Sequence, residues 1–154
     1  MRIVLDTNVL ARTTPGPSSP AREVLQRAAN APHVLLIAAP LLEELARVLR
    51  YERLRRMHGL TDEQIDAHVH FVEIAGLLVP LPVGLAPAAV PHDPDDDPVV
   101  ATAIVGQAHV ICTWDRHLRH PDVSAYCQKH GIEVMNDVEL LRILRQSEQQ
   151  TGDP

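Results

Sequence analysis

The chain has 154 residues, enough for one domain with a substantial core but not comfortably for two. Its net charge of −6 and its 3% aromatic content argue against a passive nucleic-acid binder built on a basic surface or on stacked aromatic side chains. Lys129 is the single lysine, which argues against chemistry that needs a lysine at the end of a strand.

Short apolar runs alternate with segments of helical periodicity along the chain. Strands are predicted at Arg2–Leu5, Val34–Ile37, Leu77–Leu81, Val110–Thr113 and Ile132–Met135. Helices are predicted from Pro20, from Pro40 to about Tyr51, from Thr61 to about Gly76, over Val99–Gly106, over Ser124–His130, and from Asn136 to about Arg145. Thr61 with Gln64 and Asn136 with Glu139 match the capping-box pattern, and Gly131 suits the position after a helix end.

This alternation predicts an α/β fold, a three-layer α/β/α sandwich with a central, mainly parallel sheet of about five strands. The segment from Pro82 to Pro98 holds five prolines and an acidic run, and it is predicted to be a loop. It is not a domain linker, because the same alternation continues after it. We expect one domain over residues 1–146, followed by a polar, disordered tail over residues 147–154.

Cysteine content and hydropathy predict a reduced, cytoplasmic protein. Cys112 lies in an apolar run and Cys127 in a helical one, so buried thiols are expected rather than a disulfide or a metal site. The N-terminal apolar stretch stops at Asp6, which is too short for a secretory leader. No apolar run approaches the ~20 residues that cross a bilayer, so no membrane partner is expected.

Acidic side chains occur where the predicted elements begin or end. Asp6 follows the first strand and Asp115 follows the fourth, while Asp96 and Asp97 directly precede the helix that begins near Val99. Glu44 borders the leucine stripe of the helix that begins at Pro40. Sites in parallel sheets form outside the carboxyl ends of the strands, so these acids are candidates for a shared site.

Each acid also has a purely structural interpretation. Asp6 could be a turn residue, Asp115 could cap a short helical turn, and Asp96 could cap a helix or belong to a solvated charge run. A calcium loop is excluded, because Pro98 stands at the position of its glycine and Ile104 at that of its bidentate glutamate.

Four segments stand out by their order and spacing. They are Ile3–Leu10 (IVLDTNVL), Leu41–Leu49 (LLEELARVL), Asp95–Ala103 (DDDPVVATA) and Thr113–Leu118 (TWDRHL). Together they resemble the PIN-domain family, and the branch they are most similar to is that of small prokaryotic proteins described as toxins of VapBC-like toxin–antitoxin pairs. The resemblance extends from Met1 to about Leu144.

The resemblance implies a nuclease site in which clustered carboxylates are catalytic and bind Mg²⁺ or Mn²⁺. Its acids would be Asp6, Glu44, Asp96 and Asp115, with Asp97 as an alternative ligand or a supporting partner of Asp96. Carboxylate oxygens are the ligands that these cations prefer. Two carboxylates about 4 Å apart repel by roughly 4 kcal/mol at an effective dielectric constant near 20, which a bound cation would relieve.

The resemblance also implies supporting residues and partners. Asn8 and Thr113 match polar positions that support the site, whereas Trp114 stands where a small residue is expected. The implied activity is that of a ribonuclease, an endonuclease that hydrolyses phosphodiester bonds of single-stranded or structured RNA. The implied partners are RNA, an antitoxin protein, and further copies of the chain in a homodimer or higher homo-oligomer.

Arginines near two of the acids predict the contact with RNA. Arg47, Arg50 and Arg53 lie in or just after the helix that carries Glu44, and Arg116 follows Asp115. They would contact phosphates and so reconcile a net-acidic chain with RNA binding. The alternative is a solvated helix in which Arg47 pairs with Glu43.

Other enzyme classes fit less well. Phosphatases of the haloacid-dehalogenase type need a second aspartate where this chain has Asn8, and they need a downstream lysine. Response-regulator receivers need paired early acids and a lysine at a strand end. The remaining alternative is a non-catalytic PIN-like module that binds RNA or a protein.

Overall fold

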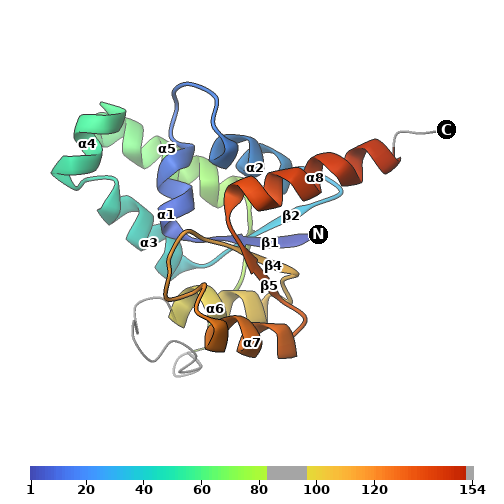
Figure 1. Cartoon of the computed structure of the whole chain (residues 1–154). Coiled ribbons are helices and arrows are strands. Elements are labelled where there is room, and N and C mark those ends of the chain that lie inside the picture. The colour runs from blue at the N-terminus through green and yellow to red at the C-terminus, as the bar shows by residue number, and fades with distance from the viewer. Residues whose placement is uncertain (83–96, 152–154) are drawn as a thin grey trace.

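A five-stranded sheet forms the centre of the computed structural model, which describes residues 1–82 and 97–151 (Figure 1). Its strands are β1 (Arg2–Leu5), β2 (Val34–Ile37), β3 (Leu77–Leu78), β4 (Val110–Cys112) and β5 (Glu133–Met135). They lie in the order β3-β2-β1-β4-β5, and every neighbouring pair is parallel. The prediction of a mainly parallel sheet of about five strands is therefore confirmed.

Helices connect the strands and cover the sheet. They are α1 (Thr7–Leu10), the 3-10 turn η1 (Ala11–Thr13), α2 (Pro20–Ala28), α3 (Ala39–Val48), α4 (Glu52–His58), α5 (Asp62–Ala75), α6 (Asp97–Val105), α7 (Pro121–Lys129) and α8 (Asp137–Thr151).

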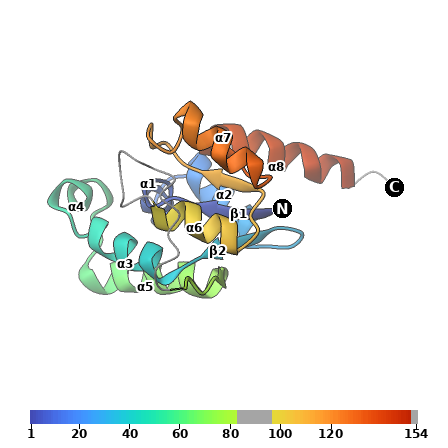
Figure 2. The same ribbon diagram turned by 90° about the horizontal axis from the view of Figure 1, so that it is seen from below.

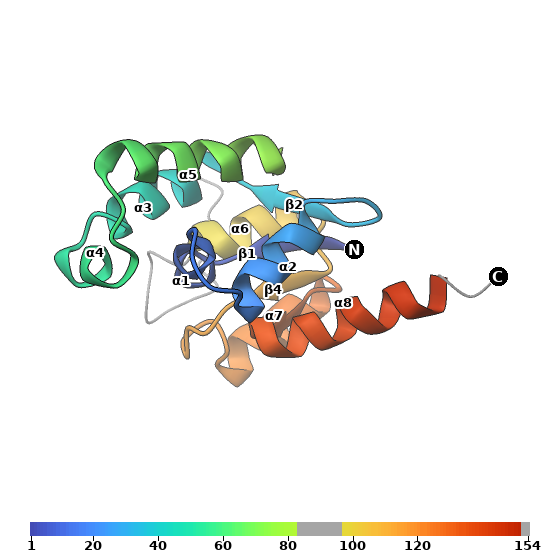
Figure 3. The same cartoon turned by 90° about the horizontal axis from the view of Figure 1, so that it is seen from above.

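Alternate residues of the same strands bury against the two helical layers. Ile3 and Leu5 of β1 belong to a core with apolar residues of α1, α2, α5 and α8; Figure 3 shows these helices from above. Val4 belongs to a second core with residues of α6 and α7; Figure 2 shows these two helices from below. Both faces of the sheet are apolar because both are covered, and this gives the three-layer sandwich expected from the sequence.

One edge of the sheet collects the polar residues that follow the strands. Because the strands are parallel, their carboxyl ends all lie at this edge, where Asp6, Thr113 and Asn136 come directly after β1, β4 and β5. The short helix α1 begins here and packs against α3, as Figure 1 shows. The edge therefore gathers residues that are far apart in the sequence.

Several boundaries differ from the prediction for identifiable reasons. β3 ends at Leu78 rather than Leu81, and it is the outermost strand on its side of the sheet, where it pairs with β2 alone. Helix α4 was not predicted, because none of its residues is buried and it has no apolar stripe to reveal it. Helix α7 begins at Pro121, where His120 caps it, rather than at Ser124.

Other local predictions are confirmed. Both capping boxes form, with reciprocal hydrogen bonds between Thr61 and Gln64 and between Asn136 and Glu139. Gly131 has a φ of 72°, the left-handed conformation that ends the preceding helix. In contrast, the last helix continues past its predicted end near Arg145 to Thr151, so it includes residues 147–151 of the predicted tail.

Both cysteines, Cys112 and Cys127, are buried free thiols. Burial raises the pKa of each thiol, so neither is a ready nucleophile or metal ligand. No helix within residues 1–82 and 97–151 is long and apolar enough to cross a membrane.

Candidate active site

Asp6 is the most tightly held acid at the carboxyl edge of the sheet. It directly follows β1 and caps α1, where its Oδ1 accepts a hydrogen bond of 2.6 Å from the Thr7 main-chain N–H. Its Oδ2 accepts from the Asn8 amide at 2.9 Å and from the Thr113 hydroxyl at 2.6 Å. With only 3% of its surface exposed, the carboxyl group has a single defined orientation.

Thr7 connects Asp6 to Glu44. Its hydroxyl donates to Glu44 Oε2 at 2.7 Å, while its main-chain N–H binds Asp6. Glu44 lies on α3, which starts from the end of β2, so this contact turns its carboxylate toward the end of β1. The sequence did not indicate a role for Thr7. The available signal was its position between Asp6 and Asn8, where its hydroxyl can reach the next element.

Thr113 connects Asp6 to Asp115 in a similar way. Its hydroxyl donates to Asp6 and accepts from the Asp115 main-chain N–H at 2.9 Å. Asp115 Oδ1 in turn accepts from the His117 main-chain N–H at 2.7 Å, so Asp115 also caps the turn that follows. A continuous run of hydrogen bonds thus connects the carboxyl groups of Glu44 and Asp6, through Thr7 and Thr113, to the main chain at Asp115.

The charge state of Asp6 reflects this crowding. Its pKa is raised from 3.8 to about 6, chiefly by burial and to a smaller extent by the negative charges of Glu44 and Asp115. The hydrogen bonds from Thr113 and Thr7 lower the pKa and oppose this rise only in part. The folded protein therefore disfavours the ionised form of Asp6, and a cation at this place would favour it.

The raised pKa of Asp6 predicts a pH-dependent loss of stability in the metal-free protein. The folded state holds the Asp6 proton more tightly than the unfolded chain does. The contribution of Asp6 is therefore most favourable below pH 3.8 and is lost as the pH rises to about 6. The shift corresponds to about 3 kcal/mol.

Urea unfolding in the presence of a chelator, between pH 4 and pH 7, measures this loss as the difference between the parent protein and Asp6→Asn. The parent should lose stability relative to the variant as the pH rises. A stability difference between the two proteins that does not change with pH would contradict the raised pKa of Asp6.

The described acids are of the chemical kind that binds a divalent cation, although they do not by themselves form a complete set of metal ligands. Within residues 1–82 and 97–151, no three His, Cys, Asp or Glu side chains lie close enough together to hold a metal ion. Asp6, Glu44 and Asp115 nonetheless supply oxygen donors of the kind Mg²⁺ and Mn²⁺ prefer. Burial disfavours the ionised form of Asp6 in spite of its hydrogen bonds, and a bound cation would offset this. Asp96, the fourth predicted ligand, lies outside the described residues.

The start of α6 lies toward the same edge of the sheet. Asp97 is the first residue of this helix, and its side chain also lies outside the described part of the structure. The end of α6 adjoins the start of β1, because the Gly106 carbonyl accepts a 2.8 Å hydrogen bond from Arg2 Nε. Helix α6 packs against β1 and β4, so its other end, at Asp97, points toward the edge that carries Asp6.

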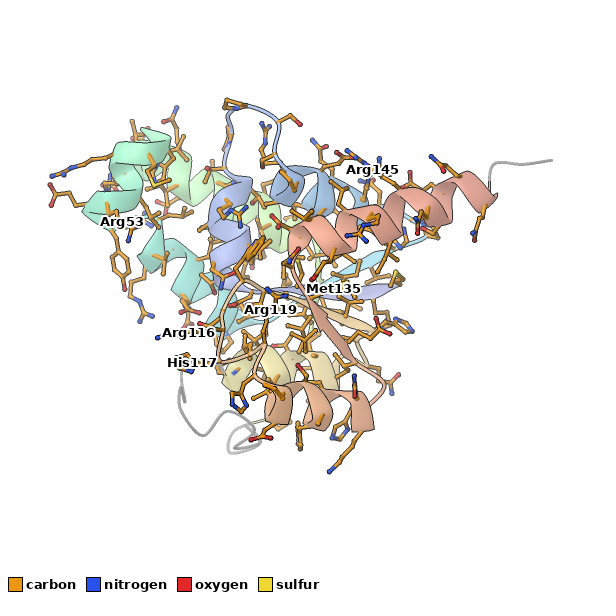
Figure 4. The ribbon with its side chains drawn as sticks, viewed as in Figure 1. Arg53, Arg116, His117, Arg119, Met135 and Arg145 are labelled. Carbon is orange, nitrogen blue, oxygen red and sulfur yellow. The ribbon has the colours of Figure 1, made fainter. Side chains whose placement is uncertain are left out.

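The predicted arginines are not equivalent. Arg50 is engaged by acids of α5, with its Nη2 2.6 Å from Asp66 Oδ1 and its Nε 3.3 Å from Asp62 Oδ1. Arg47 is largely exposed, and its Nη2 lies 4.0 Å from Glu44 Oε1 rather than pairing with Glu43. Figure 4 shows Arg53 and Arg116 toward the side of the molecule where β1 runs into α1.

Two further residues at this edge, Asp137 and Trp114, were not assigned from the sequence. Asp137 is fully buried at the start of α8 and accepts a 2.8 Å hydrogen bond from the Trp114 indole N–H. The Trp114 main-chain N–H donates to Asn8 Oδ1 at 3.2 Å. The sequence could have indicated Asp137 as a residue of this edge, because it closely follows a strand as Asp6 and Asp115 do.

Comparison with known protein families gives a match over most of the chain. The family model described as PIN domain matches residues 2–117, which include Asp6, Glu44, Thr113 and Asp115. No match was found among the curated proteins.

Proposed function

Because the chain belongs to the PIN-domain family, a nuclease fold, we propose that it is a metal-dependent ribonuclease that hydrolyses phosphodiester bonds within RNA. The observation that carries this proposal is the set of hydrogen bonds that Thr7 and Thr113 make around Asp6. Thr7 binds Asp6 through its main-chain N–H and Glu44 through its hydroxyl, and the Thr113 hydroxyl binds Asp6 and the main-chain N–H of Asp115. A purely structural group of acids would not need three carboxylates to share one edge, where their charges repel.

We further propose that Asp6, Glu44 and Asp115, with Asp96 from the acidic segment and Asp97 beside it, bind Mg²⁺ or Mn²⁺. When bound, such a cation supplies an activated water molecule and stabilises negative charge on the phosphate. Asn8 and Thr113 keep the Asp6 carboxylate in place through the hydrogen bonds to its Oδ2. Thr7 does the same for Glu44, so the acids are oriented before the substrate arrives.

Exposed arginines would guide the RNA backbone to these acids. Arg47, Arg53 and Arg116 are exposed, and Arg47 lies one turn from Glu44 on α3. Arg50 remains a candidate, but its ion pairs with Asp62 and Asp66 neutralise part of its charge. Guanidinium groups contact phosphates without regard to sequence, so these residues would set the position of the RNA rather than select its sequence.

The toxin role belongs to the same proposal and rests on the resemblance to small prokaryotic PIN proteins. On this view residues 1–146 form the nuclease domain and the protein acts in the cytoplasm. It would be inhibited by an antitoxin protein and would assemble as a homodimer or higher homo-oligomer.

An RNA-cleavage assay tests the proposed activity. Purified protein is incubated with single-stranded and structured RNA in the presence of Mg²⁺, Mn²⁺ or a chelator, and the products are resolved by length. We expect internal cleavage that requires the metal and stops with the chelator. Binding of RNA without cleavage under all of these conditions would instead favour a non-catalytic PIN-like module.

A further inference from the structure

Trp114 lies at the carboxyl edge of the sheet, although metal binding by the acids does not require a tryptophan there. It lies between Thr113 and Asp115, which both belong to the hydrogen-bonded chain of the site. Its own main-chain N–H donates to Asn8, a neighbour of Asp6. Even so, 44% of Trp114 is exposed, in a chain that has no other tryptophan. A partly exposed tryptophan therefore lies beside the acids of the candidate site.

The orientation of this ring is fixed by the protein. The indole N–H donates to Asp137 Oδ1 at 2.8 Å, and Asp137 is fully buried at the start of α8. A buried carboxylate cannot move away easily, because separating it from its partners would leave a charge without compensation. The ring is thus held in one position before any ligand binds, which lowers the entropic cost of binding to it.

Two guanidinium groups lie over the ring. The Arg12 and Arg119 guanidinium carbons lie 5.7 Å and 5.8 Å from the ring centroid, within the range of cation–π attraction. Arg12 Nη2 is 3.2 Å from the buried Asp137 Oδ2, whereas Arg119 Nη2 is 3.6 Å from the partly exposed Glu139 Oε1. Arg12 is therefore anchored, and Arg119 can exchange its exposed partner for a phosphate.

We propose that Trp114, Arg12 and Arg119 form a nucleotide-binding subsite for single-stranded RNA, next to the acids. One nucleobase takes the place of the Arg119 guanidinium group on the indole ring, and the neighbouring phosphates contact the two guanidinium groups. Aromatic stacking combined with cations is the general way in which proteins bind single strands, whereas a duplex keeps its base faces covered. This inference rests on the proposed ribonuclease function and adds to it a preference for unpaired substrate.

Intrinsic fluorescence tests the subsite directly, because Trp114 is the only tryptophan. Metal-free protein, kept from cleaving by a chelator, is titrated with a short single-stranded RNA and with a duplex of the same sequence. The single strand should quench the fluorescence to saturation, and the duplex should not. No quenching by the single strand, or equal quenching by the duplex, would overturn the proposal.

Variants separate stacking from a structural role of the ring. With a dye-labelled RNA, Trp114→Ala should weaken binding by about 5- to 150-fold, the range for removal of one base–aromatic stack. Trp114→Phe keeps an aromatic face and should lie much closer to the parent. Phe71→Ala removes a similarly exposed ring, 49% exposed, from α5 and is the matched control. Equal affinities of the parent and Trp114→Ala would rule out stacking.

Arg119→Gln provides a second test that does not disturb the Trp114–Asp137 hydrogen bond. It should weaken binding and lower the slope of log affinity against log salt by about one unit. An unchanged slope would overturn the assignment of Arg119 to the subsite.

The outcomes also separate this inference from the ribonuclease proposal. If the parent cleaves RNA with Mn²⁺ but Trp114→Ala binds and cleaves with the same KM, the subsite is wrong and the nuclease stands. If the single strand quenches Trp114 but no metal supports cleavage, the subsite stands and the nuclease is wrong.

Discussion

Replacing Asp6 by Asn is expected to lower metal-dependent RNA cleavage by at least about 100-fold. Loss of a residue that merely supports a metal ligand typically costs 10- to 100-fold, and Asp6 is proposed to be a ligand itself. The amide keeps the shape of the carboxyl group, and its oxygen can still accept the hydrogen bond from Thr7. The substitution removes the charge that would hold the cation. It also replaces Oδ2 by an amide nitrogen, which cannot accept the hydrogen bonds from Asn8 and Thr113.

Asp122→Asn is the matched control for this prediction. Asp122 lies on α7, and 90% of its side chain is exposed. The substitution makes the same chemical change there, from a carboxylate to an amide, at the surface. The control should cleave at the rate of the parent protein. Initial rates at several Mn²⁺ concentrations distinguish weaker metal binding from a damaged site. Cleavage by Asp6→Asn within a few-fold of the parent rate would remove Asp6 from the catalytic machinery.

The second large effect expected is on thermal stability. A cation that binds only the folded state stabilises it by about 2.7 kcal/mol when its concentration is 100 times the dissociation constant. For a domain of about 150 residues this corresponds to a rise in Tm of roughly 5–10 °C. The parent protein should show this rise with Mn²⁺, and Asp6→Asn should show much less.

The metal-free melting temperatures carry separate information. The pKa of Asp6, raised to about 6, means that its carboxylate is disfavoured in the fold even with its hydrogen bonds included. Above that pH, Asp6→Asn should therefore be at least as stable as the parent when metal is absent. A clearly less stable metal-free variant would make Asp6 a structural residue of the strand end, and a lost activity could then not be assigned to metal binding.

Much of the fold followed from local patterns in the sequence. The strands β1 and β2 were predicted with the bounds observed, because each is a run of apolar residues stopped by polar or helix-forming ones. Helix α4 was missed because it buries no side chain, so no periodic apolar stripe marks it. Periodicity detects burial, and an element without a buried face leaves no signal.

The candidate site followed only in part. Acids at strand ends could be predicted to lie near one another, because parallel strands place their carboxyl ends at one edge of the sheet. The threonine contacts could not be predicted, since Thr113 and Asp6 are 107 residues apart and no local pattern specifies a hydrogen bond over that separation. The contact between Trp114 and Asp137 depends in the same way on how β4 and β5 pair.

Calorimetric titration of Mn²⁺ into the metal-free protein tests most directly the claim that these acids form a metal-binding site. The parent and Asp122→Asn should each show saturable binding with the same dissociation constant. Asp6→Asn should bind at least 10- to 100-fold more weakly, as expected when the buried donor is lost. Identical binding curves for the parent and Asp6→Asn, or no binding by the parent, would contradict a metal site at Asp6.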